Sequence, residues 1–166
     1  MGTRYQGTPR EVRALNAYIK LMRAAESLSA RISRRLAEQN LTISQFGALE
    51  SLYHLGPMNQ CDLGRKLLKS SGNITLVVDN LAKRGLVRRE RGVADRRFVT
   101  VHLTDEGRRL IRGIFPGHVQ TVVEEMDVLG AAEQEELGRL TRKLGLGVAA
   151  DAVPARRAAS GGARLR

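Results

Sequence analysis

The chain has 166 residues, 42% of them hydrophobic, and a formal net charge of +11. This length suits one ordinary domain with flanking helices and excludes two large independent domains, while the apolar content excludes a disordered polypeptide. Charges interrupt every long apolar run, no signal-peptide pattern is visible and a single cysteine supports no internal disulfide, so we expect a cytoplasmic protein without a membrane partner.

The N-terminal region predicts one long helix. Residues 1–10 are expected to form a flexible arm. Over residues 11–40, apolar side chains recur at helical spacing: Val12, Leu15, Tyr18, Ile19, Met22, Ala25, Ile32 and Leu36. This stripe is too long for a compact module of this size to cover, so part of the helix is expected to pack against a second copy of the chain.

Two short helices are predicted next, at the start of a module that spans residues 41–112. Ser44 is a candidate N-cap for the first, which Gly56 and Pro57 end. Asn59 is a candidate N-cap for the second, with Asp62 at its third position in a capping-box-like arrangement.

A third helix is predicted over about 71–84, beginning near Ser70 or Ser71, with Gly85 as its left-handed C′ residue. Its apolar face consists of Ile74, Val77, Val78 and Leu81. The polar and small residues of its first turns are therefore left for another surface: Ser71, Gly72, Asn73 and Thr75, with Leu76 beside them.

A β-hairpin is predicted over about 86–103, because residues 86–91 and 98–103 each alternate apolar with polar side chains. The connection between them carries Asp95, Arg96 and Arg97. A narrow basic tip of this kind can place a guanidinium in a minor groove. We expect Asp95 to orient a neighbouring arginine, since a carboxylate facing DNA would be repelled. The alternative is a solvated hairpin tip.

The remainder is expected to be helical up to residue 147. Thr104 is a candidate cap for a fifth helix, whose first part, residues 105–112, completes the module. Gly113, Pro116 and Gly117 predict a kink or local break in it. A last amphipathic helix over about 132–144 completes a dimerising segment, 113–147. Residues 148–166 are expected to be a flexible basic tail.

The charge is concentrated in the module. Residues 65–112 hold thirteen Lys and Arg against five Asp and Glu, whereas residues 119–147 hold three against six. Three short helices followed by a hairpin are typical of a winged helix-turn-helix, whose third helix enters the major groove. The sequence therefore predicts a mainly α fold with a small two- or three-stranded β-wing, and double-stranded DNA as the partner.

The candidate DNA contacts fall into two groups. Ser70, Ser71, Gly72, Asn73 and Thr75 lie where side chains and backbone can approach base edges, although Ser70, Ser71 and Asn73 also suit a role as cap and turn residues only. Lys83 and Arg84, with Lys66 and Lys69 before the helix, are candidate phosphate contacts, which position a protein without specifying sequence.

The same stretch resembles the MarR family of bacterial transcriptional regulators. The resemblance covers about residues 12–144 and is most specific in SSGNIT, VDNL, RGLVRR, DRR and VHLTDEG, which occur together in order and spacing. It implies long N- and C-terminal dimerisation helices, a symmetric homodimer on a pseudo-palindromic operator, and usually a repressor. By position, Arg97 would be the minor-groove arginine, Asp95 its support, and Ser71, Asn73 and Thr75 the major-groove contacts.

The resemblance also implies release from DNA by a small aromatic or phenolic molecule, or by thiol oxidation. It places an effector pocket between the dimerising helices and the module. The candidates there are aromatic, histidine and methionine side chains of the first, second and fifth helices: Tyr18, Met22, Phe46, His54, Phe115 and His118. Plain core packing is the alternative for all of them.

Other functions find less support in the residues. Cys61, in a helical first turn, is a candidate redox thiol, though an inert, partly buried thiol is favoured over it. His54 and His118 have no ligand partners at metal spacing, so neither a metal nor a cofactor is expected. No nucleophile, base or phosphate-loop pattern predicts an enzyme. A non-specific nucleic-acid-coating protein would explain the charge but not the polar helix face.

Overall fold

The computed structural model describes residues 2–92 and 98–147, and the chain divides into two compact units, Met1–Glu125 and Met126–Arg166. The predicted wing-tip residues Asp95, Arg96 and Arg97, and the predicted tail, lie outside the described residues. The elements are α1 (Pro9–Ala37), α2 (Ile43–Leu55), β1 (Met58–Asn59), α3 (Gln60–Lys66), α4 (Ser71–Lys83), β2 (Val87–Arg91), β3 (Val99–Leu103), α5 (Asp105–Met126) and α6 (Ala131–Gly147).

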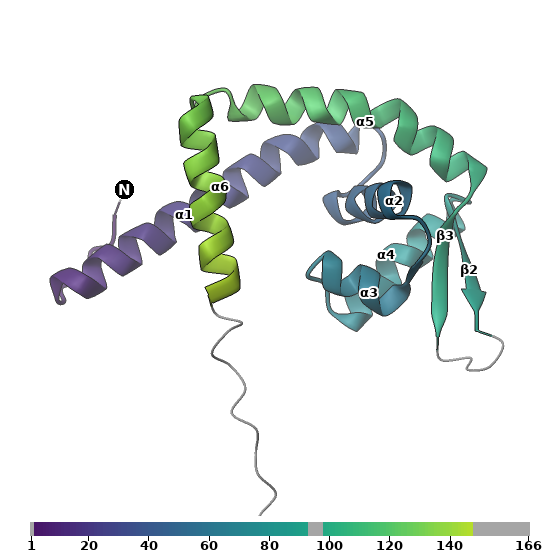
Figure 1. Ribbon diagram of the computed structural model, residues 1–166, viewed down its shortest axis with the longest axis horizontal. Coiled ribbons are helices and arrows are strands. Elements are labelled where there is room, and N and C mark those ends of the chain that lie inside the picture. The colour runs from purple at the N-terminus through teal and green to yellow at the C-terminus, as the bar shows by residue number, and fades with distance from the viewer. Residues whose placement is uncertain (1, 93–97, 148–166) are drawn as a thin grey trace, which may run out of the picture. The chain divides into compact units, whose positions relative to one another are not determined.

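The predicted fold class is confirmed, since the described residues are mainly helical and carry one small antiparallel sheet. The sheet has three strands in the order β1-β3-β2. In Figure 1, α2, α3 and α4 lie together beside the hairpin of β2 and β3. Within the described ranges, each helix is too short or too polar to cross a membrane.

Helix α1 begins before the predicted residue 11. Thr8 is its N-cap in a capping box with Glu11, and Pro9 occupies the first turn, where proline's missing N–H is no loss. The Thr8 N–H donates to the Glu11 carboxylate at 2.8 Å, which lowers the pKa of that carboxyl. At the other end, α1 stops at Ala37 rather than residue 40, and Asn40 adopts a positive φ of 53°.

The predicted cap of the second helix was wrong. Thr42, not Ser44, is the N-cap of α2, because its hydroxyl accepts from the Gln45 N–H at 3.2 Å while the Gln45 side chain accepts from the Thr42 N–H at 3.0 Å. This reciprocal capping box satisfies two donors at the helix start and places Ser44 inside the first turn.

The cap predicted for α3 is confirmed in part. Asn59 Oδ1 accepts from the Cys61 N–H at 2.8 Å. The Asp62 carboxylate does not complete a capping box but pairs with the Arg65 guanidinium one turn later. Strand β1 was not predicted: Met58 and Asn59 form only two residues of strand, too short for a periodic pattern.

The core of the first unit lies between α2, α3, α4, the sheet and the start of α5. Its fully buried side chains are Leu49, Leu52, Leu63, Ile74, Val78, Leu81, Val101 and Ile111. Burying an aliphatic side chain of this kind contributes about 1.5–3 kcal/mol. Three of these residues belong to α4, so its orientation is determined by packing, and its opposite face is left to solvent.

A close junction joins the end of α4 to the start of α5. Gly85 is the left-handed C′ residue, with φ of 69°, and the Leu86 N–H donates back to the Leu81 carbonyl at 3.0 Å. The Thr104 hydroxyl donates to the Gly85 carbonyl at 2.6 Å and accepts from the Gly107 N–H at 3.0 Å, which confirms Thr104 as the cap of α5. The junction therefore sets the direction in which α5 leaves the sheet.

Helix α5 is continuous from Asp105 to Met126, so the predicted local break at Gly113, Pro116 and Gly117 does not occur. Proline removes one backbone donor from the helix but leaves the rest of the ladder in place. The helix axis instead changes direction in its middle, as Figure 1 shows, which corresponds to the predicted kink.

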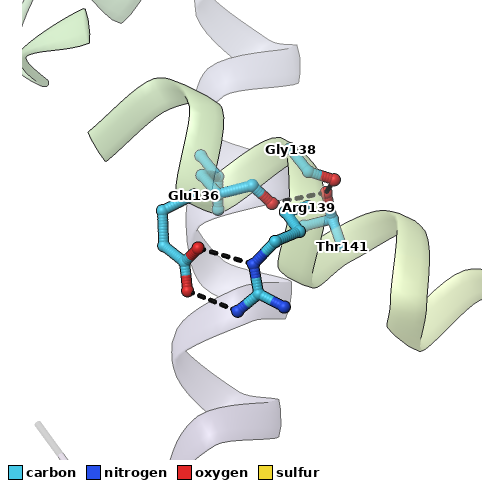
Figure 2. Close-up of polar contacts among 5 residues, drawn as sticks. Glu136, Gly138, Arg139 and Thr141 are labelled. Atoms are coloured by element: carbon cyan, nitrogen blue, oxygen red, sulfur yellow. Dashed lines mark hydrogen bonds and ion pairs between the residues drawn. The ribbon is translucent and has the colours of Figure 1, made fainter. Parts of the chain in front are cut away.

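Helix α6 extends beyond the predicted 132–144 and has no buried residue within its bounds. Figure 2 shows its best-defined polar contacts: the Arg139 guanidinium donates twice to the Glu136 carboxylate, at 2.7 Å each, and the Thr141 hydroxyl donates to the Leu137 carbonyl at 2.7 Å. All these contacts are local, so they stabilise the helix without fixing a partner for its apolar side chains.

Candidate nucleic-acid interface

The N-terminal face of α4 is a polar surface open to solvent. Ser70 is the N-cap, and its hydroxyl accepts from the Asn73 N–H at 3.4 Å, so this residue serves the helix itself. Ser71, Gly72, Asn73 and Thr75 are all exposed. Their donors and acceptors, together with the N-terminal amides of α4, are of the kinds that contact base edges and phosphates.

Two further features of this face suit a close approach to a duplex. A Cβ added at Gly72 would meet no atom of the described residues within 4 Å, so packing inside the chain does not require glycine there. Leu76 is 60% exposed on the same helix, although a leucine normally lies in the core. At Gly72 the backbone itself can approach a duplex, and Leu76 adds an apolar side chain to the polar groups of this face.

Arg89 joins the hairpin to α4 and was not singled out from the sequence. Its guanidinium lies 2.5 Å from the Asp79 carboxylate and also donates to the backbone carbonyl of Thr75 at 3.3 Å. Both partners belong to α4, whereas Arg89 belongs to β2. The side chain thereby fixes the hairpin against the helix that carries the exposed polar face. Only the alternation of β2 could have suggested that Arg89 points toward α4.

We predict that Arg89→Met lowers the affinity for a DNA duplex about fivefold more than Arg88→Met does, because only Arg89 holds the hairpin against α4. Both substitutions remove one positive charge from β2, but Arg88 pairs with the exposed Glu90 of its own strand at 2.9 Å. Because the Arg89 pair is partly exposed, its loss is expected to cost only about 1 kcal/mol of stability. Binding titrations at fixed salt check this, and equal losses for the two variants would contradict it.

The two basic residues at the end of α4 differ in their surroundings. Lys83 is exposed, as are Lys66 and Lys69. Arg84 instead donates from its guanidinium to the Asn40 carbonyl at 2.5 Å and to the Gln39 carbonyl at 3.5 Å. It therefore satisfies carbonyls at the turn after α1, a structural role that the sequence pattern did not indicate beside its predicted phosphate contact.

The candidate effector residues separate into two groups. Phe46, His54, Phe115 and His118 come together: the Phe46 and His118 ring centroids are 4.1 Å apart, and those of His54 and Phe115 are 4.9 Å apart. Tyr18 and Met22 do not join this cluster, because they lie on α1 with 61% and 41% of their surfaces exposed.

Beside the aromatic cluster, a cleft of about 560 Å³ opens between α1 and α5. Most of its lining was not anticipated, and His118 is its only residue among the six candidates. The lining residues are Arg35, Leu36, Glu38, Gln39, Arg109, Leu110, Gly113, Ile114, Gly117, His118 and Thr121. The cleft thus combines an apolar wall with the guanidinium groups of Arg35 and Arg109 and the carboxylate of Glu38, and Arg109 is paired with Glu106 at 2.5 Å. Two cations beside one lining carboxylate leave room for an anion with a hydrophobic body.

Burial lowers the pKa of His118, and the nearby Glu50 carboxylate opposes this only in part. A histidine whose pKa is depressed in the folded state binds its proton more readily when unfolded. We therefore expect the free energy of unfolding to fall as the pH drops below about 6.5. Thermal unfolding between pH 8 and pH 5 checks this. His118→Gln should flatten the dependence, and an unchanged profile in His118→Gln would contradict the assignment.

Cys61 is exposed in the first turn of α3, beside a hollow of about 220 Å³ between α3 and α4. The expected partial burial of this thiol is therefore wrong, whereas its redox role stays a prediction. Within residues 2–92 and 98–147, no three His, Cys, Asp or Glu side chains cluster as a metal site would require.

Comparisons with known proteins agree with this geometry. A model of the MarR family matches residues 41–99. The uncharacterized HTH-type transcriptional regulator YkoM of Bacillus subtilis is 36% identical over 134 residues, which cover 81% of this chain and 87% of YkoM.

Two solved structures are similar to the chain. Sco3205, a MarR family regulator from Streptomyces coelicolor crystallised with DNA, superposes with a TM-score of 0.77 at 25% identity, covering 88% of this chain and 92% of Sco3205. BpsR of Bordetella bronchiseptica, whose DNA binding is regulated by 6-hydroxynicotinic acid, superposes with a TM-score of 0.73 at 27% identity, covering 78% of this chain and 98% of BpsR.

Proposed function

The chain belongs to the MarR family, and from this premise we propose that it is a homodimeric transcriptional repressor that binds a pseudo-palindromic operator and is released by a small aromatic ligand. The observation that carries the DNA-binding part is the exposed polar face of α4. Three buried aliphatic side chains hold α4 in place, and Ser71, Asn73 and Thr75 lie exposed on it. This arrangement suits a helix that enters a major groove.

Three sets of residues would contact the DNA. The side chains of α4 contact base edges in the major groove, and Arg97 enters the minor groove with Asp95 as its support, as the family pattern implies. Lys66, Lys69 and Lys83 contact phosphates. The similar Sco3205 was crystallised with DNA, which supports this arrangement. The affinity of this chain for DNA should fall steeply with rising salt concentration, because each neutralised phosphate releases counterions.

The dimer is supported by exposed apolar side chains on both terminal helices. Leu15, Tyr18 and Met22 lie exposed on α1, and Leu137, Leu140 and Leu144 lie exposed on α6. Apolar stripes of this extent on a monomer mark interaction surfaces. A second copy, covering both stripes, accounts for them and supplies the second recognition helix that a palindrome requires.

The effector site we propose is the cleft between α1 and α5. Arg35 would pair with a carboxylate or phenolate, and Arg109 would join it by exchanging its exposed ion pair with Glu106 for the ligand. Leu36, Leu110 and Ile114 would contact the ring. Regulation of BpsR by 6-hydroxynicotinic acid supports this class of ligand. A hydroxylated aromatic acid that occupies the cleft should raise the melting temperature and lower operator affinity, and the Arg109→Leu variant should show neither effect.

Footprinting on DNA fragments selected for binding to the protein tests the regulator proposal, and the protected site is the selected operator. We expect a discrete protected palindrome with two half-sites about one helical turn apart. Uniform, weak protection of every sequence would instead favour a nucleic-acid-coating protein.

A further inference from the structure

The hydroxyl group of Thr75 is already engaged inside the protein. It donates its single proton to the Ser71 carbonyl at 2.8 Å and accepts a hydrogen bond from the Gln60 side-chain amide at 3.0 Å. A hydroxyl group has one donor and two acceptor lone pairs. With both bonds in place, Thr75 has no donor left for a base, and its exposed side chain can offer only a methyl group and one lone pair.

Gln60 is the residue that holds this arrangement from outside the helix. It is the first residue of α3, fifteen positions from Thr75 in the sequence, and no local pattern connects the two. The bond to Ser71 alone leaves the hydroxyl able to exchange partners with an approaching base. The second bond, from the Gln60 amide, opposes such an exchange and holds the Thr75 side chain in one rotamer.

Leu76, the residue after Thr75, adds an exposed apolar side chain to this turn of α4, with 60% of its surface exposed. The hollow between α3 and α4, about 220 Å³, is lined by both Gln60 and Thr75, and the polar side chains of Arg65, Lys69 and Ser71 also line it. In the major groove, the apolar group that distinguishes one base from the others is the C5-methyl group of thymine.

We propose that Thr75, positioned by Gln60, recognises a thymine C5-methyl group through its own methyl group rather than through its hydroxyl. Gln60 is thereby a positioning residue for sequence recognition. This inference rests on the proposed function, because it needs an operator on which α4 lies in the major groove.

The test replaces each thymine of the selected operator, one at a time, with deoxyuridine, which lacks only the methyl group. For the wild-type chain we expect one thymine in each half-site at which this change lowers affinity about fourfold, the effect of one buried methyl group. Thr75→Ser, which keeps the hydroxyl, should lose this discrimination. Thr75→Val, which keeps a methyl group in the same shape, should bind and discriminate like the wild type.

The Gln60→Leu variant tests whether Gln60 positions Thr75 for recognition or only stabilises the fold. We expect it to reduce the thymine-to-uracil affinity ratio in the wild-type background and to leave it unchanged in the Thr75→Val background, where the amide has lost its partner. A Thr75→Val variant that binds at least tenfold more weakly, beside a Thr75→Ser variant that retains the ratio, would overturn the proposal. Failure to select any operator would contradict the proposed function instead.

Discussion

Replacing Arg97 with alanine is expected to lower operator affinity about tenfold to hundredfold while leaving the dimer intact. The magnitude is that of one well-placed arginine in a DNA groove, about 1–3 kcal/mol. The described hairpin ends with the Gly92 N–H donating to the Phe98 carbonyl at 2.9 Å, so residues 93–97 connect the two strands. In the sequence, Arg97 belongs to that connection and not to α1 or α6, whose exposed apolar stripes are the proposed dimer surface. The substitution is therefore expected to leave the dimer intact.

The control for Arg97→Ala is Arg139→Ala. It removes the same charge from α6, where the guanidinium pairs with Glu136 (Figure 2). Binding titrations at one salt concentration should separate the two variants, and sedimentation should show both as dimers. Equal affinities for Arg97→Ala and Arg139→Ala would show that Arg97 does not contact DNA.

Gly107→Ala is expected to destabilise the first unit by about 3 kcal/mol, the upper end of the usual range for overpacking. A Cβ at this position would lie 2.9 Å from the carbonyl carbon of Leu86, with the oxygen nearer still. That oxygen also accepts from the Thr104 N–H at 3.1 Å, so it cannot move without disturbing the junction between the sheet and α5.

Gly113→Ala is the matched control, because Gly113 also lies in α5 and an added Cβ would meet no described atom within 4 Å. Replacing a helical glycine without a clash should stabilise by up to about 1 kcal/mol. Chemical denaturation measures both variants. A Gly107→Ala protein as stable as Gly113→Ala would show that the junction accommodates a side chain.

Much of the fold could be predicted because its signals are local. The apolar periodicity of α4, the left-handed Gly85 and the Thr104 cap each depend on a few neighbouring residues, and each appears in the structure as expected. Strand β1 escaped prediction because two residues pair with β3 only through tertiary contact. Thr42 and Ser44 are both good caps, and only the reciprocal bond with Gln45 decides between them.

The candidate site was less accessible to sequence reasoning, because its decisive contacts join distant residues. Gln60 with Thr75, Arg89 with Asp79, and Arg84 with the Asn40 carbonyl leave no trace in local patterns. The cleft likewise depends on how α1 and α5 face each other.

The most direct test of sequence-specific binding by α4 is a competition between two duplexes. One is the selected operator and the other has the same composition in scrambled order, and both are measured at one salt concentration near the physiological value. A sequence-specific regulator should prefer the operator by at least about a thousandfold. The Ser71→Ala, Asn73→Ala double variant should lose most of that ratio and retain the weaker binding that depends on phosphate contacts. Equal affinity of the wild-type chain for both duplexes would contradict the assignment of α4 as a recognition helix.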